Sequence, residues 1–125
     1  MKGKLDDRRP IYLQIKESIE DSIINGTIKV GERIPSTNEL AKFYNINPAT
    51  ARQGINELAQ EEIILKQRGV GMFVTEVGKE KLIGHRKQQF YENFVIPLKN
   101  EASKLQISNE QLYDMLKEGE VRYGD

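Results

Sequence analysis

Residues 36–59 read STNELAKFYNINPATARQGINELA, and this stretch predicts two helices separated by a short turn. Ser36 and Glu39 form an S-x-x-E capping box, in which each side chain accepts a hydrogen bond from a backbone N–H that lacks a partner at the start of a helix. Asn47 is a good N-cap for the second helix, and Pro48 is well tolerated at the first helical position. The sequence therefore defines both helix starts sharply.

The turn between these helices has the spacing of a helix-turn-helix motif. Ala41 is a small residue in the first helix, Asn45 tolerates a positive φ in the turn, and Ala51 is a small residue in the second helix. Small residues at these positions let two helices cross closely. Gly54 costs about 0.8 to 1.0 kcal/mol relative to Ala inside a helix, and we expect close packing on the first helix of the chain to be the reason for it.

The second of these helices carries side chains on its outer side that suit the edges of DNA bases. Arg can bond guanine with two hydrogen bonds, Gln and Asn can bond adenine, and Ala or a Thr methyl group can contact the methyl group of thymine. A polar face in contact with water has a similar composition, so the helix alone leaves both interpretations open. The candidates for base contact are Ala49, Thr50, Arg52, Gln53 and Asn56.

A β-hairpin is predicted directly after this helix. Residues 63–67 and 72–75 are two β-prone runs, and Arg68-Gly69-Val70-Gly71 joins them. Behind a recognition helix such a hairpin is a wing. Its tip presents Lys66 and Arg68, and its glycines let the backbone approach a phosphate or the minor groove. A plain hairpin turn is the alternative.

The residues before position 36 predict one further helix and a short extended segment. Isoleucines recur at every fourth position from residue 11 to residue 23 and line one face of a helix, and Asn25-Gly26 suits a left-handed cap. Residues 30–32 are typical of a turn, and residues 33–35 of an extended segment that ends at a proline.

The composition excludes several classes of site. The 125 residues include no Cys and one His, so disulfides, thiolate metal sites and histidine clusters are excluded. The sequence contains no set of nucleophile, base and orienting group and no phosphate-binding loop of the G-x-x-x-x-G-K-S/T type. We expect a protein that is not an enzyme and binds no cofactor or metal. Short apolar runs and a charged start predict no membrane segment and a cytoplasmic location.

Net charge and local charge point in different directions. Lys and Arg number 19, as do Asp and Glu, which gives a net charge of +0, whereas nucleic-acid binders are often basic. A winged helix that binds protein instead of DNA is therefore the rival interpretation. Residues 40–56 and 63–75 nevertheless contain no acidic side chain. The basic side chains in these two stretches are Lys42, Arg52, Lys66 and Arg68.

The last third of the chain predicts helices with no core of their own. Pro97 should kink or interrupt the first of them, and Ser108 and Gln111 form a capping box for a last helix that Gly119 stops. So short a tail cannot enclose a ligand pocket of about 300 to 1,000 Å³. We expect its apolar face to pack on a second copy in a homodimer, with packing onto its own first domain as the alternative. The residues assigned to dimerisation are Ile83, Phe90, Tyr91, Phe94, Leu98, Leu105, Leu112 and Leu116.

Several motifs in order resemble one family of regulators. They are PIYLQI at residues 10–15, GERIPSTNELA at residues 31–41, NPAT at residues 47–50, and Gly69-x-Gly71-x-Phe73-Val74. Together they resemble a GntR-type winged-helix repressor, and NPAT with the short tail resembles the YtrA-like branch. The resemblance implies DNA contacts from Thr37 and Asn38, from residues 47–53, and from Arg68 and Gly69. Many relatives carry Arg in place of Asn38 and a basic residue in place of Pro48, which leaves Arg52 as the one guanidinium expected on the helix-turn-helix surface.

The combined prediction is a mainly α protein with a small β-hairpin. Residues 1–76 form a winged helix-turn-helix DNA-binding domain, and residues 77–125 form a helical dimerisation segment. The predicted function is a repressor that binds a pseudo-palindromic operator on double-stranded DNA as a homodimer, and the YtrA-like resemblance implies transporter genes as targets. The sequence assigns no small-molecule effector. The predicted DNA-binding residues are Thr37, Asn38, Asn47, Pro48, Ala49, Thr50, Arg52, Gln53, Asn56, Lys66, Arg68 and Gly69.

Overall fold

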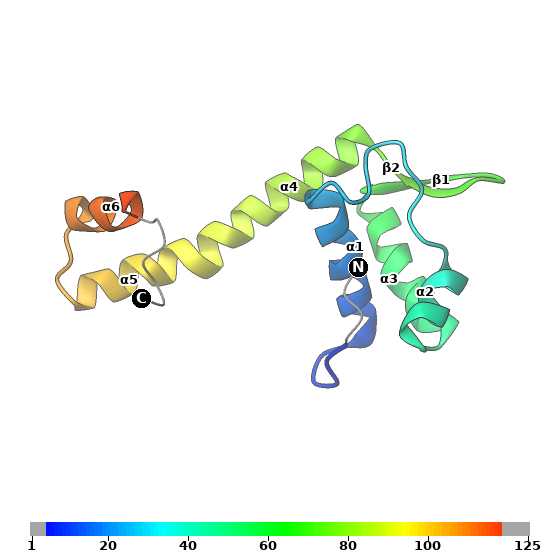
Figure 1. The fold of residues 1–125 in the computed structure, drawn as a ribbon, viewed down its shortest axis with the longest axis horizontal. Coiled ribbons are helices and arrows are strands. Elements are labelled where there is room, and N and C mark those ends of the chain that lie inside the picture. The colour runs from blue at the N-terminus through cyan, green and yellow to red at the C-terminus, as the bar shows by residue number, and fades with distance from the viewer. Residues whose placement is uncertain (1–4, 119–125) are drawn as a thin grey trace. The chain divides into compact units, whose positions relative to one another are not determined.

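The computed structural model describes residues 5–118 and is mainly α-helical with one β-hairpin (Figure 1). The chain divides into two compact units, Met1–His85 and Arg86–Asp125. The elements in chain order are α1 (Ile11–Ile24), α2 (Thr37–Tyr44), α3 (Pro48–Gln60), β1 (Ile64–Gln67), β2 (Gly71–Val74), α4 (Glu76–Phe90), a π-helix η1 (Tyr91–Val95), α5 (Ile96–Lys104) and α6 (Asn109–Lys117). This architecture confirms the predicted fold class.

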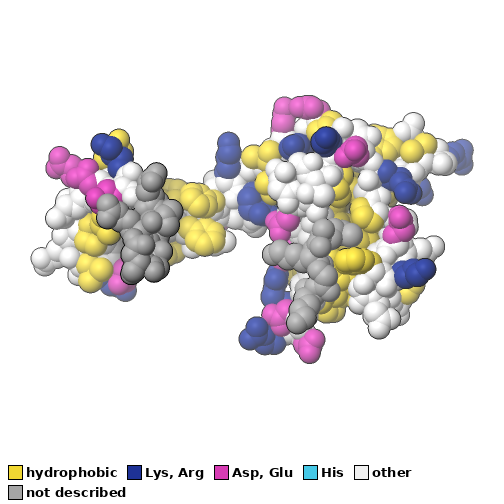
Figure 2. Space-filling view, in the orientation of Figure 1, with side chains coloured by type: hydrophobic (Ala, Val, Ile, Leu, Met, Phe, Trp, Pro, Cys, Tyr) yellow, Lys and Arg dark blue, Asp and Glu magenta, His cyan; other side chains and the backbone are white. Residues whose placement is uncertain are grey.

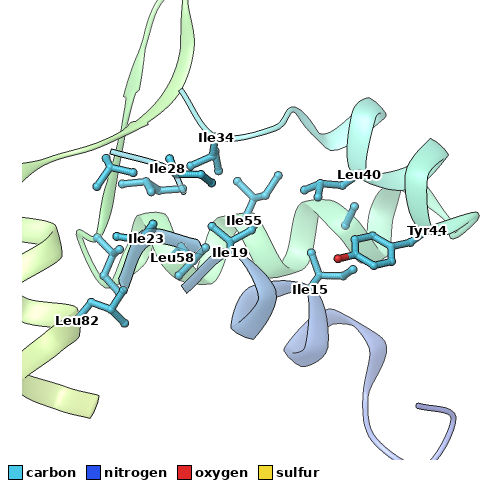
Figure 3. Close-up of a cluster of buried hydrophobic side chains, with 14 residues drawn as sticks. Ile15, Ile19, Ile23, Ile28, Ile34, Leu40, Tyr44, Ile55, Leu58 and Leu82 are labelled. Carbon is cyan, nitrogen blue, oxygen red and sulfur yellow. The ribbon is translucent and has the colours of Figure 1, made fainter. Parts of the chain in front are cut away.

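The core of the first unit lies between α1, α2, α3 and the hairpin (Figure 3). Ile15, Ile19 and Ile23 are fully buried, as their spacing of four residues predicts for one face of a helix. They pack in one cluster with Leu40 of α2 and Leu58 of α3. Burial of a Leu or Ile side chain stabilises a fold by about 1.5 to 3 kcal/mol, so this cluster fixes the place of α3.

Gly54 marks the point where α3 crosses α1. A Cβ atom at this position would lie 2.8 Å from the backbone oxygen of Tyr12 and 3.5 Å from the Ile15 side chain. The 2.8 Å approach is closer than a carbon atom tolerates. The predicted reason for the glycine, close packing on the first helix, is therefore confirmed.

The predicted helix boundaries around the helix-turn-helix are confirmed. The Ser36 side chain accepts from the Glu39 N–H at 3.1 Å, and the Glu39 carboxylate accepts from the Ser36 N–H at 2.8 Å. Asn45 caps α2 in the left-handed conformation with φ of 56°. The Asn47 side chain accepts from the Ala49 N–H at 2.9 Å, with Pro48 in the first helical position.

Residues 31–34 run beside the hairpin and bond to the free edge of β2. β1 and β2 pair antiparallel from Ile64 opposite Val74 to Gln67 opposite Gly71, so Gly71 belongs to the strand and the turn spans residues 68–70. On the other side of β2, the Ile34 N–H donates to the Met72 oxygen at 2.8 Å. Arg33 forms a bridge opposite Phe73. Within the predicted extended segment at residues 33–35, Arg33 thus forms an isolated bridge to β2, and the sheet itself remains two-stranded.

The first turns of α4 pack on the first unit. Leu82 is buried in the core cluster, and a Cβ atom at Gly78 would lie 2.2 Å from the Ile63 oxygen. The compact first unit accordingly extends to His85. Ile83, assigned to dimerisation, lies within it and is half-buried. The domain boundary at residues 76 and 77 and the role of Ile83 stay predictions.

The α-helix of the second unit is interrupted near Pro97, as predicted. The interruption is a wider helical turn, and the helix does not break. The Ile96 N–H donates to the oxygen of Tyr91, five residues earlier, which closes the π-helix η1 directly before Pro97. Proline donates no hydrogen bond, and its ring crowds the carbonyl four residues earlier, that of Asn93. A wider turn there gives the ring room.

Apolar side chains form patches on the face of the second unit that Figure 2 shows. Ala102 is its one buried apolar residue among those described. Leu112 is half-buried, and the other residues assigned to dimerisation in this unit are exposed: Phe90, Tyr91, Phe94, Leu98, Leu105 and Leu116. The predicted stop at Gly119 lies outside the described residues, and α6 ends at Lys117. Within residues 5–118, no helix has the length and apolar character needed to cross a membrane.

Candidate nucleic-acid interface

The outer face of α3 is open and polar, as its sequence predicts. Ala49, Arg52, Gln53 and Asn56 are exposed and line one shallow hollow. Glu57 also borders this hollow, but its carboxylate faces the Lys16 ammonium at 3.4 Å. The surface of α3 therefore offers hydrogen-bond donors and acceptors, and its nearest carboxylate already has a cationic partner.

Near the C-terminal end of α3, Lys16 of α1 forms ion pairs with Glu57 and Glu61. Its Nζ lies 2.9 Å from the Glu61 carboxylate and 3.4 Å from that of Glu57. Burial lowers the pKa of Lys16, but the hydrogen bond to Glu61 and the charges of Glu61, Glu20 and Glu57 outweigh it and hold the pKa above its ordinary value. Lys16 thus remains charged at neutral pH and links α1 to the last turn of α3 and to its C-cap, Glu61.

The start of α3 divides its predicted contacts into two kinds. The Asn47 side chain is engaged as the helix cap, and Thr50 is half-buried. Pro48 and Ala49 are exposed. The structure thus gives Asn47 a role in starting the helix, and it leaves Pro48 and Ala49 available as small apolar contacts at the end of α3 that lies nearest α2.

A groove of about 280 Å³ joins residues from three parts of the first unit. Thr37 from the start of α2, Arg52 and Asn56 from α3, and Lys66 from β1 all line it. Four predicted DNA-binding residues that are up to 29 positions apart in the chain therefore meet in one place. Among the residues that line the groove there are three cations and no carboxylate. The other residues that line it are Arg33, Ile34, Pro35, Ser36, Ile55, Gly71 and Met72.

Arg33 is the cation of the groove that the sequence pattern did not assign to DNA binding. It stands one position before Ile34, which is buried, and residues of an extended segment alternate between two faces. This alternation was the available signal, because a buried Ile34 leaves Arg33 on the opposite, exposed side. Its significance depends on the groove, which no local pattern reveals.

The remaining predicted contacts lie outside this groove. Asn38 is exposed on the first turn of α2, and Arg68 and Gly69 are exposed at the turn of the hairpin. Gly69 has a φ of 80°, which favours glycine, and a Cβ atom there would meet nothing within 4 Å. Basic side chains gather on and around the hairpin in Figure 2. No group of three or more His, Asp or Glu side chains in residues 5–118 could hold a metal ion.

Comparison with protein families gives one matching model, described as bacterial regulatory proteins of the gntR family, over residues 11–74. The repressor YtrA of Bacillus subtilis is 31% identical over 87% of this chain and 83% of its own length. YurK of the same organism, an uncharacterised transcriptional regulator, is 37% identical over 52% of this chain, which spans 27% of that relative.

Solved structures share the fold. A GntR family transcriptional regulator from Listeria monocytogenes matches with a TM-score of 0.75 and 36% identity, covering 93% of this chain and 100% of that one. The DNA-binding domain of AraR in complex with operator ORX1 matches with a TM-score of 0.51 and 32% identity, over 60% of this chain and 92% of that domain.

Proposed function

Because the chain belongs to the gntR family of bacterial regulatory proteins, we propose that it is a repressor that binds a pseudo-palindromic operator as a homodimer. It is a DNA-binding transcriptional regulator and not an enzyme. To this family-level function, the proposal adds the symmetry of the operator, the homodimer and the residues that contact DNA. The observation that carries it is the exposed face of α3 with Arg52, Gln53 and Asn56, beside a groove free of carboxylates.

In this proposal α3 enters the major groove. An α-helix fits the width of that groove, and the base edges there distinguish all four base pairs. Arg52 and Gln53 supply the bidentate groups, Asn56 a further amide, and Ala49 an apolar contact for a thymine methyl group. All four project from the outer face of a helix that the core and Lys16 hold rigidly.

The other predicted contacts position the protein on the DNA backbone. Phosphate contacts fix register without reading sequence. We assign this role to polar, basic and glycine residues around α3 and on the wing, which are Thr37, Asn38, Asn47, Thr50, Lys66, Arg68 and Gly69. Pro48 has no hydrogen-bond donor, and in this proposal it makes an apolar contact beside Ala49. The net charge of +0 does not oppose this, because the affinity for phosphate depends on the local field in the groove and at the wing.

The exposed apolar surface of the second unit supports the homodimer. Phe90 and Phe94 are 57% and 65% exposed in the single chain, and their rings lie 5.7 Å apart. Contiguous apolar patches on a protein surface commonly mark interaction sites. A C2 dimer would cover the same surface on both copies and place two α3 helices about 34 to 36 Å apart, or a multiple of it, on successive turns of DNA.

Two further parts of the proposal concern the cell. We place the regulator in the cytoplasm with the chromosome, and the YtrA-like resemblance adds transporter genes as targets. A gel shift with the DNA upstream of the protein's own gene tests whether that DNA contains an operator. A winged helix that binds only protein, the alternative that zero net charge favours, would prefer no duplex.

The sharpest test of the proposed contacts is Arg52→Ala. Loss of a bidentate base contact should weaken operator binding by about 1 to 3 kcal/mol and leave the affinity for random duplex nearly unchanged. Fluorescence anisotropy with both duplexes measures the two affinities, and Lys42→Ala on α2 is the matched control because it removes a cation from the same motif. Equal losses on both duplexes would remove Arg52 from base recognition.

A further inference from the structure

We propose that Arg33 binds a phosphate of the DNA backbone in the groove between the segment of residues 33–37, α3 and the hairpin. The inference rests on the proposed DNA-binding mode and adds to it a contact that lies outside the helix-turn-helix and the wing tip. Three observations support the proposal: the backbone of Arg33 is fixed, its side chain packs on Gly71, and the groove is lined by cations without a carboxylate.

The backbone of Arg33 is held by the sheet. Arg33 forms a bridge opposite Phe73, and the next residue, Ile34, donates its N–H to Met72 at 2.8 Å and buries its side chain. On the preceding side, the Gly31 N–H donates to the Val74 oxygen at 2.8 Å. A side chain on such a fixed backbone loses less freedom when it binds a ligand than one on a mobile loop does.

The Arg33 side chain packs against the backbone of Gly71. A Cβ atom at Gly71 would lie 3.1 Å from Cδ and 3.4 Å from Cγ of Arg33, so the aliphatic stem lies against bare backbone. Gly69, the first glycine of the Gly-x-Gly pair, has open space around it. The two glycines therefore differ: Gly69 serves the turn, and Gly71 makes room for the stem of Arg33 at the edge of the groove.

The groove around Arg33 has the charge that an anion needs. Arg33, Arg52 and Lys66 line it without a carboxylate among the lining residues. Glu39 faces the Arg33 guanidinium from outside at 3.8 Å, with both side chains more than half exposed. An exposed pair of this kind contributes about 0 to 1 kcal/mol, and Glu39 is already held by the Ser36 N–H at 2.8 Å. A phosphate can therefore take the place of Glu39, because a guanidinium binds phosphate with two parallel hydrogen bonds.

The position of the groove indicates which phosphate it would hold. Arg52 and Asn56 line both the groove and the outer face of α3. A strand whose bases meet α3 must pass its backbone along the edge of that face, where Arg33 and Lys66 lie. Arg33 would thus fix the register of α3 on the DNA, while the bases are read by α3 itself.

The test is the salt dependence of DNA binding by the full chain. Each phosphate contact contributes about 0.9 to the slope of log affinity against log salt on duplex DNA. Arg33→Met keeps the aliphatic stem on Gly71 and removes the charge, so the slope should fall by about 0.9 on operator and random duplex alike. Arg33→Lys should retain the slope. Lys29→Ala, which removes an exposed cation outside the groove, is the matched control and should also leave the slope unchanged.

The outcomes separate this inference from the proposed function. If the unaltered protein shows no salt-dependent binding to any duplex, the proposed function itself fails. If it binds and Arg33→Met leaves the slope unchanged, the phosphate contact is refuted and the DNA-binding mode stands. Affinity that falls with an unchanged slope, together with a lower thermal midpoint, would assign Arg33 a purely structural role and also overturn the inference.

Discussion

The two units of the chain use similar apolar side chains in opposite ways. In the first unit, Ile15, Ile19 and Leu58 are fully buried in a cluster that includes residues from every helix of the motif. In the second unit, Leu105 and Leu116 are 61% and 65% exposed. The first unit therefore buries a core of its own, although Phe43, Leu65 and Val77 stay exposed on it, and the second unit leaves most of its large apolar side chains exposed.

The difference indicates that the first unit folds around its own core, whereas the second unit is suited to assembly with another copy. A helix with an apolar stripe must bury it, within its own domain or against another chain. α1 achieves this on α3, whereas the helices of the second unit have little to pack on within their own unit. Stability of the first unit should thus be independent of the second, and operator affinity should depend on both.

The largest effect is expected from charges placed on the second unit. Phe90→Glu combined with Phe94→Glu should prevent dimerisation and lower operator affinity by about 10²- to 10⁴-fold, because linked binding at two half-sites raises affinity by that factor. The thermal transition of the first unit should change little. Light scattering after gel filtration measures mass, and fluorescence anisotropy measures affinity.

The matched control for this prediction is Gln89→Glu combined with Asn93→Glu. It adds the same two charges directly beside the aromatic pair at exposed positions, and it should leave the dimer and the affinity intact. If the unaltered chain is a monomer at micromolar concentration, the proposed homodimer is wrong, because no second copy then covers the exposed apolar surface of the second unit.

A second prediction compares the same truncation in both units. Leu58→Ala should lower the free energy of unfolding by about 2 to 5 kcal/mol, because it removes buried methyl groups and leaves a cavity. Leu105→Ala should change the unfolding of the first unit by less than about 0.5 kcal/mol and should instead weaken the dimer. Urea denaturation followed by circular dichroism gives the first quantity, and the concentration dependence of mass gives the second.

Equal destabilisation by the two truncations would contradict the different roles of the two units. It would mean that Leu105 is buried against the first unit of its own chain, which was the alternative open from the sequence. If Leu105→Ala leaves the dimer unaffected, Leu105 lies outside the interface, and the aromatic residues of η1 and its neighbours form it.

Local sequence signals predicted most of the fold of the first unit. Capping boxes, the left-handed Asn45 and the proline at the start of α3 act within a few residues, so a sequence pattern identifies them directly. The hairpin followed from two β-prone runs, although Gly71 belongs to the strand and not to the turn. Gly54 was predicted correctly because its cost in a helix requires a close neighbour.

Long-range packing explains what the sequence did not reveal. The burial of Leu82 depends on where α4 meets the first unit, and a one-dimensional apolar stripe cannot separate it from Ile83. The π-helix η1 is one of several ways to accommodate Pro97. Arg33 joins the candidate site only because the sheet, α3 and Gly71 enclose one groove. The roles of the site residues remain predictions for the experiments above.

The smallest expected effect compares the two capping boxes. Both have the same pair of distances, 3.1 Å and 2.8 Å, but the first uses Glu39 and the second uses Gln111. Hydrogen bonds from the Ser36 backbone and side chain, and then the charge of Arg33, hold the pKa of Glu39 below its ordinary value of 4.5. Because the pKa of Glu39 is lower in the folded state than in the unfolded state, its carboxylate stabilises the fold at pH values above the unfolded-state pKa. This stabilisation is lost as the pH falls through the folded-state pKa of Glu39.

Replacement of the serines tests both boxes at neutral pH. Ser36→Ala should cost the first unit about 1 kcal/mol of unfolding free energy, and Ser108→Ala should cost α6 a similar amount. Acid then separates the boxes, because Glu39→Gln keeps an acceptor that does not titrate. The free energy of unfolding of this variant should fall less than that of the unaltered chain between about pH 6 and about pH 3, and Gln111→Glu should make α6 more sensitive to acid. Identical acid dependence in all three proteins would show that neither carboxylate is held by its cap in solution.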